Sequence, residues 1–173
     1  MRRALDALYA ASGVLGAVFL ALIALTVLVQ VGFNIVDRLA ALVTGRPIGL
    51  VLPSYAEFTG YFLAASTFFA AAHTLARGAH IRVTLVLLRL PASARRVAEV
   101  WCAGIGLVFA AYFTWASIGL VRDSLTYGDV SPGMVAVPLW LVQAPLALGL
   151  AALTIALADR LVGALLGHVA EDA

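Results

Sequence analysis

Four long apolar segments constrain the fold of this chain more than any other feature. They cover about Leu8–Val36, Tyr55–Leu75, Val97–Val121 and Val135–Ala158. Each reaches the roughly 20 residues that a transmembrane helix needs. A chain of 173 residues that is 64% hydrophobic and 12% charged is also too small to hide that surface inside a soluble domain. The sequence therefore predicts an all-α integral membrane protein, a single membrane domain (1–173) of four transmembrane helices.

A basic segment joins the second and third apolar segments. Gly78 is expected to end the second helix, and Pro91 ends a following stretch of about ten residues (80–90) that is too short to span a bilayer. On a helix, Arg82 and Arg89 lie along one narrow stripe while leucine and valine fill the rest. This pattern predicts a short interfacial amphipathic helix whose arginines reach lipid phosphates.

The distribution of arginine predicts the orientation. One side of the membrane receives eight arginines, at the N-terminus, in the basic segment and at Arg160, whereas the other receives three. Short loops rich in arginine stay in the cytoplasm. Both termini are therefore predicted to be cytoplasmic. If the chain lies in the inner membrane of a Gram-negative cell, the loops at about 37–54 and 122–134 face the periplasm.

A polar stripe marks the end of the first apolar segment. Gln30, Asn34 and Asp37 recur at i, i+4 and i+7, which places them on one helix face. An unpaired polar group is costly in hydrocarbon. We expect Gln30 and Asn34 to pack against another helix. The alternative for Gln30 is that its side chain snorkels to the headgroups. Asp37 is expected to lie at the headgroups.

The second apolar segment opens with a capping-box pattern. Ser54 is followed three residues later by Glu57, immediately before the apolar run. In a capping box the glutamate bonds back to the amide of the N-cap residue. A carboxylate at the membrane edge is alternatively a contact site for an ion or a partner. Ser54 and Glu57 are thus predicted to form a helix cap. The alternative is that they contact an ion or a partner at the outer face of the membrane.

The histidines argue against a haem site. His73 and His80 lie close to the basic segment, and the third, His168, lies in the C-terminal tail. Bis-histidine ligation requires a partner at matching depth in another span. We therefore expect no cofactor and interpret His73 and His80 as residues beside the headgroups.

The sequence does not contain the patterns of an enzyme. It has no phosphate-binding glycine motif, no catalytic triad and no paired carboxylates at membrane depth. No span carries an acidic residue or arginine at its centre, as a self-sufficient ion carrier would. Asp123 and Asp129 in the second outer loop could meet a soluble partner, or could simply be solvated. We expect a non-catalytic partner of another protein, and no nucleic acid.

Three stretches carry a resemblance to a known family. Gly78-Ala79-His80-Ile81-Arg82-Val83, the acidic Glu57 and Ser131 with Pro138-Leu139-Trp140 resemble the small membrane (Q-type) subunit of tripartite ATP-independent periplasmic (TRAP) transporters. Size and four spans agree, so the resemblance covers nearly the whole chain. One departure is Thr84, where members commonly carry an acidic residue, so a salt bridge of that carboxylate is not expected here.

The resemblance implies a scaffold. A member would associate with a large (M-type) membrane transport subunit that binds solute and ion and moves as an elevator. It would also offer part of the docking face for a periplasmic substrate-binding protein. His80, Arg82 and Arg89 would then anchor lipids or the large subunit at the cytoplasmic side, with Asp123 and Asp129 at the outer face.

Two other classes stay open at the level of sequence. The first is a membrane anchor of a respiratory complex, against which the histidine positions argue. The second is a self-contained small channel or exporter, which needs a polar stripe through the whole bilayer, whereas only the outer third of the first segment offers one.

Overall fold

The chain folds into four helices, here described from a computed structural model that covers residues 2–78 and 91–166. Their bounds are α1 Arg2–Thr44, α2 Tyr55–Ala76, α4 Ala92–Tyr127 and α5 Leu139–Leu165. No strand occurs within the described ranges. The predicted interfacial helix at 80–90, with His80, Arg82, Thr84 and Arg89, lies outside them.

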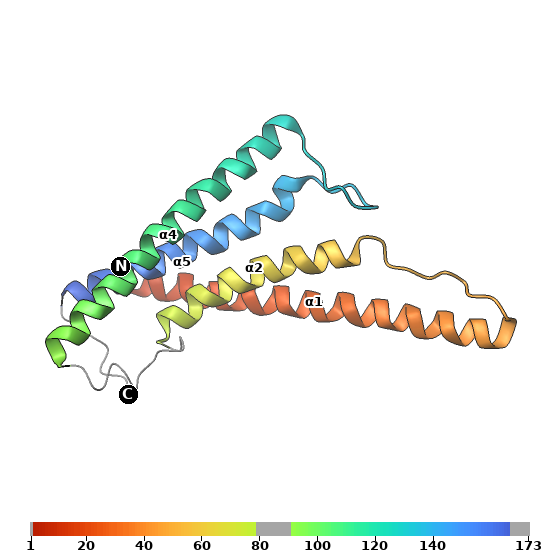
Figure 1. Cartoon of the computed structure of the whole chain (residues 1–173), viewed down its shortest axis with the longest axis horizontal. Coiled ribbons are helices and arrows are strands. Elements are labelled where there is room, and N and C mark those ends of the chain that lie inside the picture. Colours follow the sequence, from red (N-terminus) through yellow and green to blue (C-terminus); the bar gives the residue numbers. More distant parts are fainter. Residues whose placement is uncertain (1, 79–90, 167–173) are drawn as a thin grey trace.

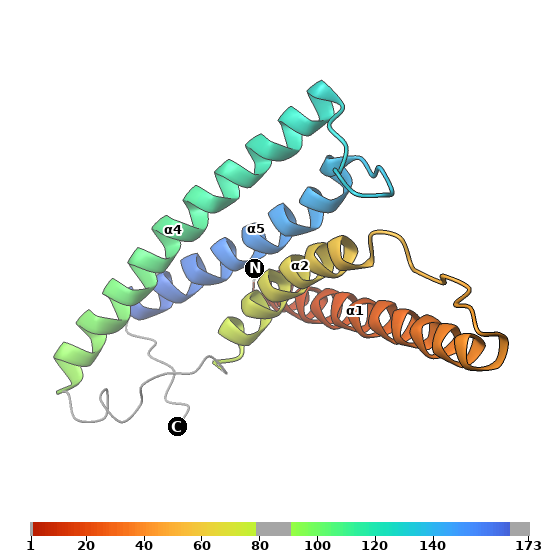
Figure 2. The same ribbon diagram turned by 45° about the vertical axis from the view of Figure 1, so that its right-hand side comes forward.

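The four helices form two antiparallel hairpins, α1–α2 and α4–α5, joined where α2 packs against α5 (Figure 1). The start of α1, the end of α2, the start of α4 and the end of α5 lie at one end, which we call the terminal end. The loops 45–54 and 128–138 lie at the opposite end, which we call the loop end. Turning the molecule shows that the two hairpins diverge toward the loop end (Figure 2).

Three helices continue past their predicted ends, and α5, which was expected to end near Ala158, continues to Leu165. The first was expected to end near Val36, but α1 continues to Thr44 and ends only at Gly45, whose positive φ of 72° suits glycine. The third was expected to end near Val121, but α4 continues to Tyr127 and ends at Gly128, which has a φ of 68°. Charged residues at a membrane edge mark the end of the hydrocarbon and not the end of the helix.

Three of the described helices are long and apolar enough to cross a membrane by length and composition: α1, α4 and α5. The second helix matches its predicted span closely, but its hydroxyl residues, Glu57 and His73 lower its hydropathy. The all-helical prediction is confirmed for residues 2–78 and 91–166, whereas a count of four spans stays a prediction.

Small residues and two hydrogen bonds join α1 to α2. The Ser12 hydroxyl donates to the Phe69 carbonyl at 2.8 Å, and the Ser66 hydroxyl donates to the Gly16 carbonyl at 2.9 Å. A Cβ at Gly16 would meet Ala70 backbone at 3.1 Å. The backbones therefore approach closely, as small residues permit in membrane helices, and each serine satisfies its hydroxyl across the interface.

His73 lies in this same interface. Its Nδ1–H donates to the Tyr9 carbonyl at 2.8 Å, and its ring lies over Gly13, where a Cβ would come within 2.7 Å of ring atoms. The Tyr9 hydroxyl in turn donates to Asp159 of α5 at 3.4 Å. His73 is therefore a half-buried packing residue at the terminal end, and its position beside the headgroups stays a prediction.

The second hairpin uses the same chemistry. Thr114 of α4 and Thr154 of α5 pair through their hydroxyls at 2.9 Å, and the Ser124 hydroxyl donates to the Gln143 side chain at 2.9 Å. Polar residues thus hold the two helices at two levels. Because these polar groups satisfy one another inside the hairpin, α4 leaves its other face apolar.

Candidate partner-binding site

The predicted capping box does not form. Ser54 precedes α2 with a left-handed backbone (φ 55°), and its side chain makes no capping hydrogen bond. Its hydroxyl instead accepts the backbone N–H of Val135 at 3.1 Å. The left-handed conformation turns the Ser54 side chain away from the helix amides, so it joins the start of α2 to the loop between α4 and α5.

Glu57 lies beside the same loop. Its carboxylate oxygens occupy the space next to Gly133, where a Cβ would overlap them. A side chain at position 133 would displace the Glu57 carboxylate from this place. Glu57 therefore packs against loop 128–138 at the loop end and does not complete a cap, which keeps the alternative of an outer-face contact open.

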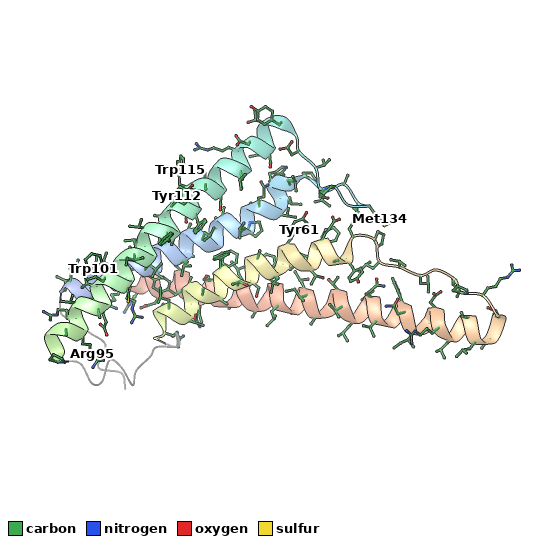
Figure 3. The ribbon with its side chains drawn as sticks, viewed as in Figure 1. Tyr61, Arg95, Trp101, Tyr112, Trp115 and Met134 are labelled. Atoms are coloured by element: carbon green, nitrogen blue, oxygen red, sulfur yellow. The ribbon has the colours of Figure 1, made fainter. Side chains whose placement is uncertain are left out.

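Loop 128–138 has a defined shape because Ser131 organises it. The buried Ser131 donates its hydroxyl to the Val135 carbonyl at 3.0 Å, and its backbone N–H donates to the Val137 carbonyl at 2.8 Å. Met134, at the turn that these bonds close, is 85% exposed. The stick view shows Met134 at the extremity of the loop (Figure 3). A flexible thioether presented in this way suits contact with a protein partner.

We expect Gly133→Ala to destabilise the chain through Glu57. The new methyl overlaps the carboxylate, so the Glu57 side chain must rotate away from the loop. Because a flexible side chain can move aside, we expect a cost at the low end of the about 1–3 kcal/mol that overpacking gives. The measurement is thermal unfolding of the purified chain in detergent. Gly60→Ala, where no atom lies within 4 Å of the new Cβ, is the control.

The double variant Gly133→Ala/Glu57→Ala decides whether the carboxylate is the cause. Removing it opens the space, so we expect the double variant to be more stable than the sum of the single effects predicts, with a coupling of about 0.5–3 kcal/mol. Additive effects would show that Glu57 and Gly133 do not touch.

The polar stripe of α1 holds the first loop. Gln30, which is 7% exposed, accepts the Leu52 N–H at 2.9 Å and donates to Asn34 at 3.4 Å. Asp37 accepts the Gly49 N–H at 2.7 Å. The stripe therefore faces protein, but its partner is the backbone of loop 45–54 and not the neighbouring helix that we expected for Gln30. The Asp37 carboxylate binds this loop instead of standing free at the headgroups.

A stripe of large apolar residues runs along the face of α4 that points away from α5. The spacing alternates between three and four residues, so the members lie above one another on the helix. We call it the α4 stripe: Trp101, Ile105, Val108, Tyr112 and Trp115, all more than half exposed. In the stick view Trp101, Tyr112 and Trp115 point to the outside of the molecule (Figure 3).

The α4 stripe ends in a hollow of about 470 Å³ beside Gly119. Trp115 borders it on one side and Arg122 and Asp123 on the other. The hollow exists because Gly119 occupies the next position of the stripe and has no side chain, and no atom lies within 4 Å of where its Cβ would stand. A side chain from a neighbouring helix can insert here as a knob enters a hole.

The α4 stripe was not among the sites predicted from sequence, although its aromatic and branched residues recur there at alternating spacings of three and four. The acidic candidates separate in the structure: Asp123 lies on the last turns of α4 beside the hollow, whereas Asp129 lies in the loop, and both are exposed. Asp123 is thus a helical residue and not a loop residue. At the start of α4, Arg95 and Glu99 form an ion pair with 3.6 Å between Nε and Oε1.

These features define a class: a small helical membrane protein whose described surface offers apolar faces for contact. Comparison of the sequence with models of known protein families agrees with this class. The family model of tripartite ATP-independent periplasmic transporters, DctQ component, matches residues 38–167. The chain belongs to this family, and it is thus a transmembrane component of a TRAP transporter. Neither a curated protein nor a solved structure matches the chain.

Proposed function

We propose that the chain is the non-catalytic scaffold of its transporter. In this proposal it holds the large (M-type) elevator subunit in place during binding-protein-dependent uptake driven by an ion gradient. The solute is a small organic molecule of the carboxylate class, selected by the other two components. Family membership over residues 38–167 supports the assignment, and the exposed α4 stripe is the observation that carries the scaffolding role.

The α4 stripe is the proposed seat of the large subunit. Trp101 and Trp115, 66% and 72% exposed, are large and rigid, and such residues bury much area at little conformational cost. The hollow beside Gly119 can receive a side chain of a partner helix, and contact with lipid chains does not require such a hollow. Aromatic anchors beside a hollow suit a protein helix better than they suit lipid alone.

The proposed topology follows the arginine distribution. All four helices cross the bacterial inner membrane, the terminal end faces the cytoplasm and the loop end faces the periplasm. α2 crosses while packed between α1 and α5, which covers its polar residues. The arginines of the basic segment, Arg82 and Arg89 with His80 beside them, bind lipid phosphates or the large subunit at the cytoplasmic surface.

The loop end is the proposed contact for the periplasmic binding protein. Glu57, Asp129 and the exposed Met134 lie on or against loop 128–138, and Asp123 lies on the neighbouring end of α4. Acidic groups around an apolar tip favour an encounter with a basic patch on a soluble partner, and such an encounter weakens with added salt.

The experiment is affinity purification of the tagged chain from its native membrane in mild detergent, followed by mass spectrometry. We expect a very hydrophobic multispan protein in stoichiometric amount, with a periplasmic binding protein captured weakly. A flavoprotein or iron–sulfur subunit would assign the chain to a respiratory complex. Recovery of the chain alone, as a homo-oligomer, would favour a self-contained channel. Either result would overturn the scaffold.

A further inference from the structure

The last turns of α1 extend well past the rest of the α1–α2 hairpin. Ser66 lies against Gly16 and Phe69 against Ser12, and the two helices run antiparallel. The start of α2 therefore lies level with about residue 27 of α1, and the remaining turns of α1 project about 25 Å beyond it. Figure 1 shows this projection with loop 45–54 returning along it. We call residues 35–44 the α1 arm.

The α1 arm is amphipathic, and its polar side is already satisfied. Asp37 accepts the Gly49 N–H, and Thr44 donates to the Ala40 carbonyl. The opposite side carries Ile35, Leu39 and Leu42 at i, i+4 and i+7. Leu42 is 82% exposed, and such an apolar side is unfavourable in water.

The exposed side continues a stripe that runs the length of α1. Its members recur at intervals of three, four or seven residues, which keeps them on one helix face, and each is exposed: Val14, Val18, Leu25, Leu28, Ile35, Leu39 and Leu42. Along the spanning part of α1 such a stripe lies in hydrocarbon. The stripe reaches the arm without an interruption by a charged residue, so the same medium is expected to cover both parts.

The length of α1 explains how a bilayer can cover both its spanning part and the α1 arm. At 43 residues α1 is about 65 Å long, whereas a bilayer with its headgroups measures about 40–45 Å. A hydrophobic stretch longer than the bilayer tilts. A steep tilt lowers the arm into the boundary between headgroups and acyl chains, where amphipathic helices bind. Arg38 and Arg46, both exposed, stand where they can reach phosphates.

We propose that the α1 arm is a lipid-binding element, embedded along its Ile35–Leu39–Leu42 side in the membrane leaflet at the loop end, with Arg38 and Arg46 on lipid phosphates. Lipid is favoured over a protein partner because the stripe of the arm is aliphatic, without the aromatic residues and the hollow of the α4 stripe, and has arginines beside it. This requires that α1 cross the membrane, but it does not depend on the scaffold role.

The test is a spin-label scan of the arm in the full transporter complex, reconstituted in vesicles of phosphatidylethanolamine and phosphatidylglycerol. Cys102, which is exposed on α4, is first replaced by serine. Single cysteines from Ile35 to Thr44 are then labelled, and collisions with oxygen and with a water-soluble nickel chelate are measured. We expect oxygen to dominate at Ile35, Leu39 and Leu42, and nickel to dominate at Thr44 on the opposite side.

The pattern over ten positions keeps the result interpretable if one variant misfolds. Nickel access on both sides of the helix would show that the arm stands in water, which overturns the proposal. Immobilised labels that neither reagent reaches at Leu39 and Leu42 would show a protein partner there, which also overturns it. Only oxygen access with helical periodicity supports burial in lipid.

Discussion

Gly119→Leu is expected to reduce the amount of large subunit that co-purifies with the chain by tenfold or more. The leucine occupies the base of the hollow at the end of the α4 stripe, so a helix knob can no longer enter it fully. A lost close-packed contact of about 1.4 kcal/mol already corresponds to a factor of about ten in a binding constant. The chain itself keeps its stability, because no atom lies within 4 Å of the new Cβ.

Gly32→Leu is the control for this experiment. It places the same side chain in the middle of another long helix, α1, also with no atom within 4 Å of the new Cβ, and away from the α4 stripe. We expect normal recovery of the large subunit with this variant. Equal recovery with both leucine variants, each with an unchanged unfolding temperature, would show that the α4 stripe faces lipid and not the large subunit.

Gly13→Val is expected to separate α1 from α2 at the terminal end. The new side chain overlaps the His73 ring, which cannot swing away without losing its 2.8 Å bond to the Tyr9 carbonyl. Overpacking costs about 1–3 kcal/mol, and the lost hydrogen bond adds about 0.6 kcal/mol by the average for membrane helices. The measurement is the midpoint of thermal unfolding in detergent, which we expect to fall.

Two variants test the cause. Gly32→Val introduces the same β-branched residue into the same helix where no atom lies within 4 Å of the Cβ, so we expect little change. The double variant Gly13→Val/His73→Ala removes the ring and is expected to regain part of the lost stability. If Gly32→Val were as destabilising as Gly13→Val, valine in the helix and not contact with His73 would be responsible.

Several features were readable from the sequence because they depend on local chemistry. A run of about 20 apolar residues can satisfy its backbone in lipid only as a helix, so the helical class follows from composition alone. The second helix begins at Tyr55 as predicted and ends at Ala76 beside Gly78, which has a φ of 69°. The family also followed from short motifs: Gly78–Val83, Glu57 and Ser131 with Pro138–Trp140 all lie in the range that the family model matches.

What the sequence could not decide was the partner of each polar group. The spacing of Ser54 and Glu57 satisfies the rule for a capping box, yet Ser54 adopts a left-handed backbone and bonds to Val135, 81 residues away along the chain. Gln30 was correctly seen as a residue that needs a partner, but Leu52 of the loop supplies it. A helical period shows which residues share a face, and it does not show what covers that face.

Local propensity and hydropathy thus determined that this chain is helical and that it is suited to a membrane, and short motifs indicated the family to which it belongs. Only the tertiary structure decided that α1 continues to Thr44, that His73 packs over Gly13 and that the α4 stripe stays uncovered by the described helices. The physical reason is that helix formation and membrane insertion depend on neighbours within a few turns. The packing of one helix on another depends on contacts between residues tens of positions apart, and a local sequence pattern does not show which of these residues are in contact.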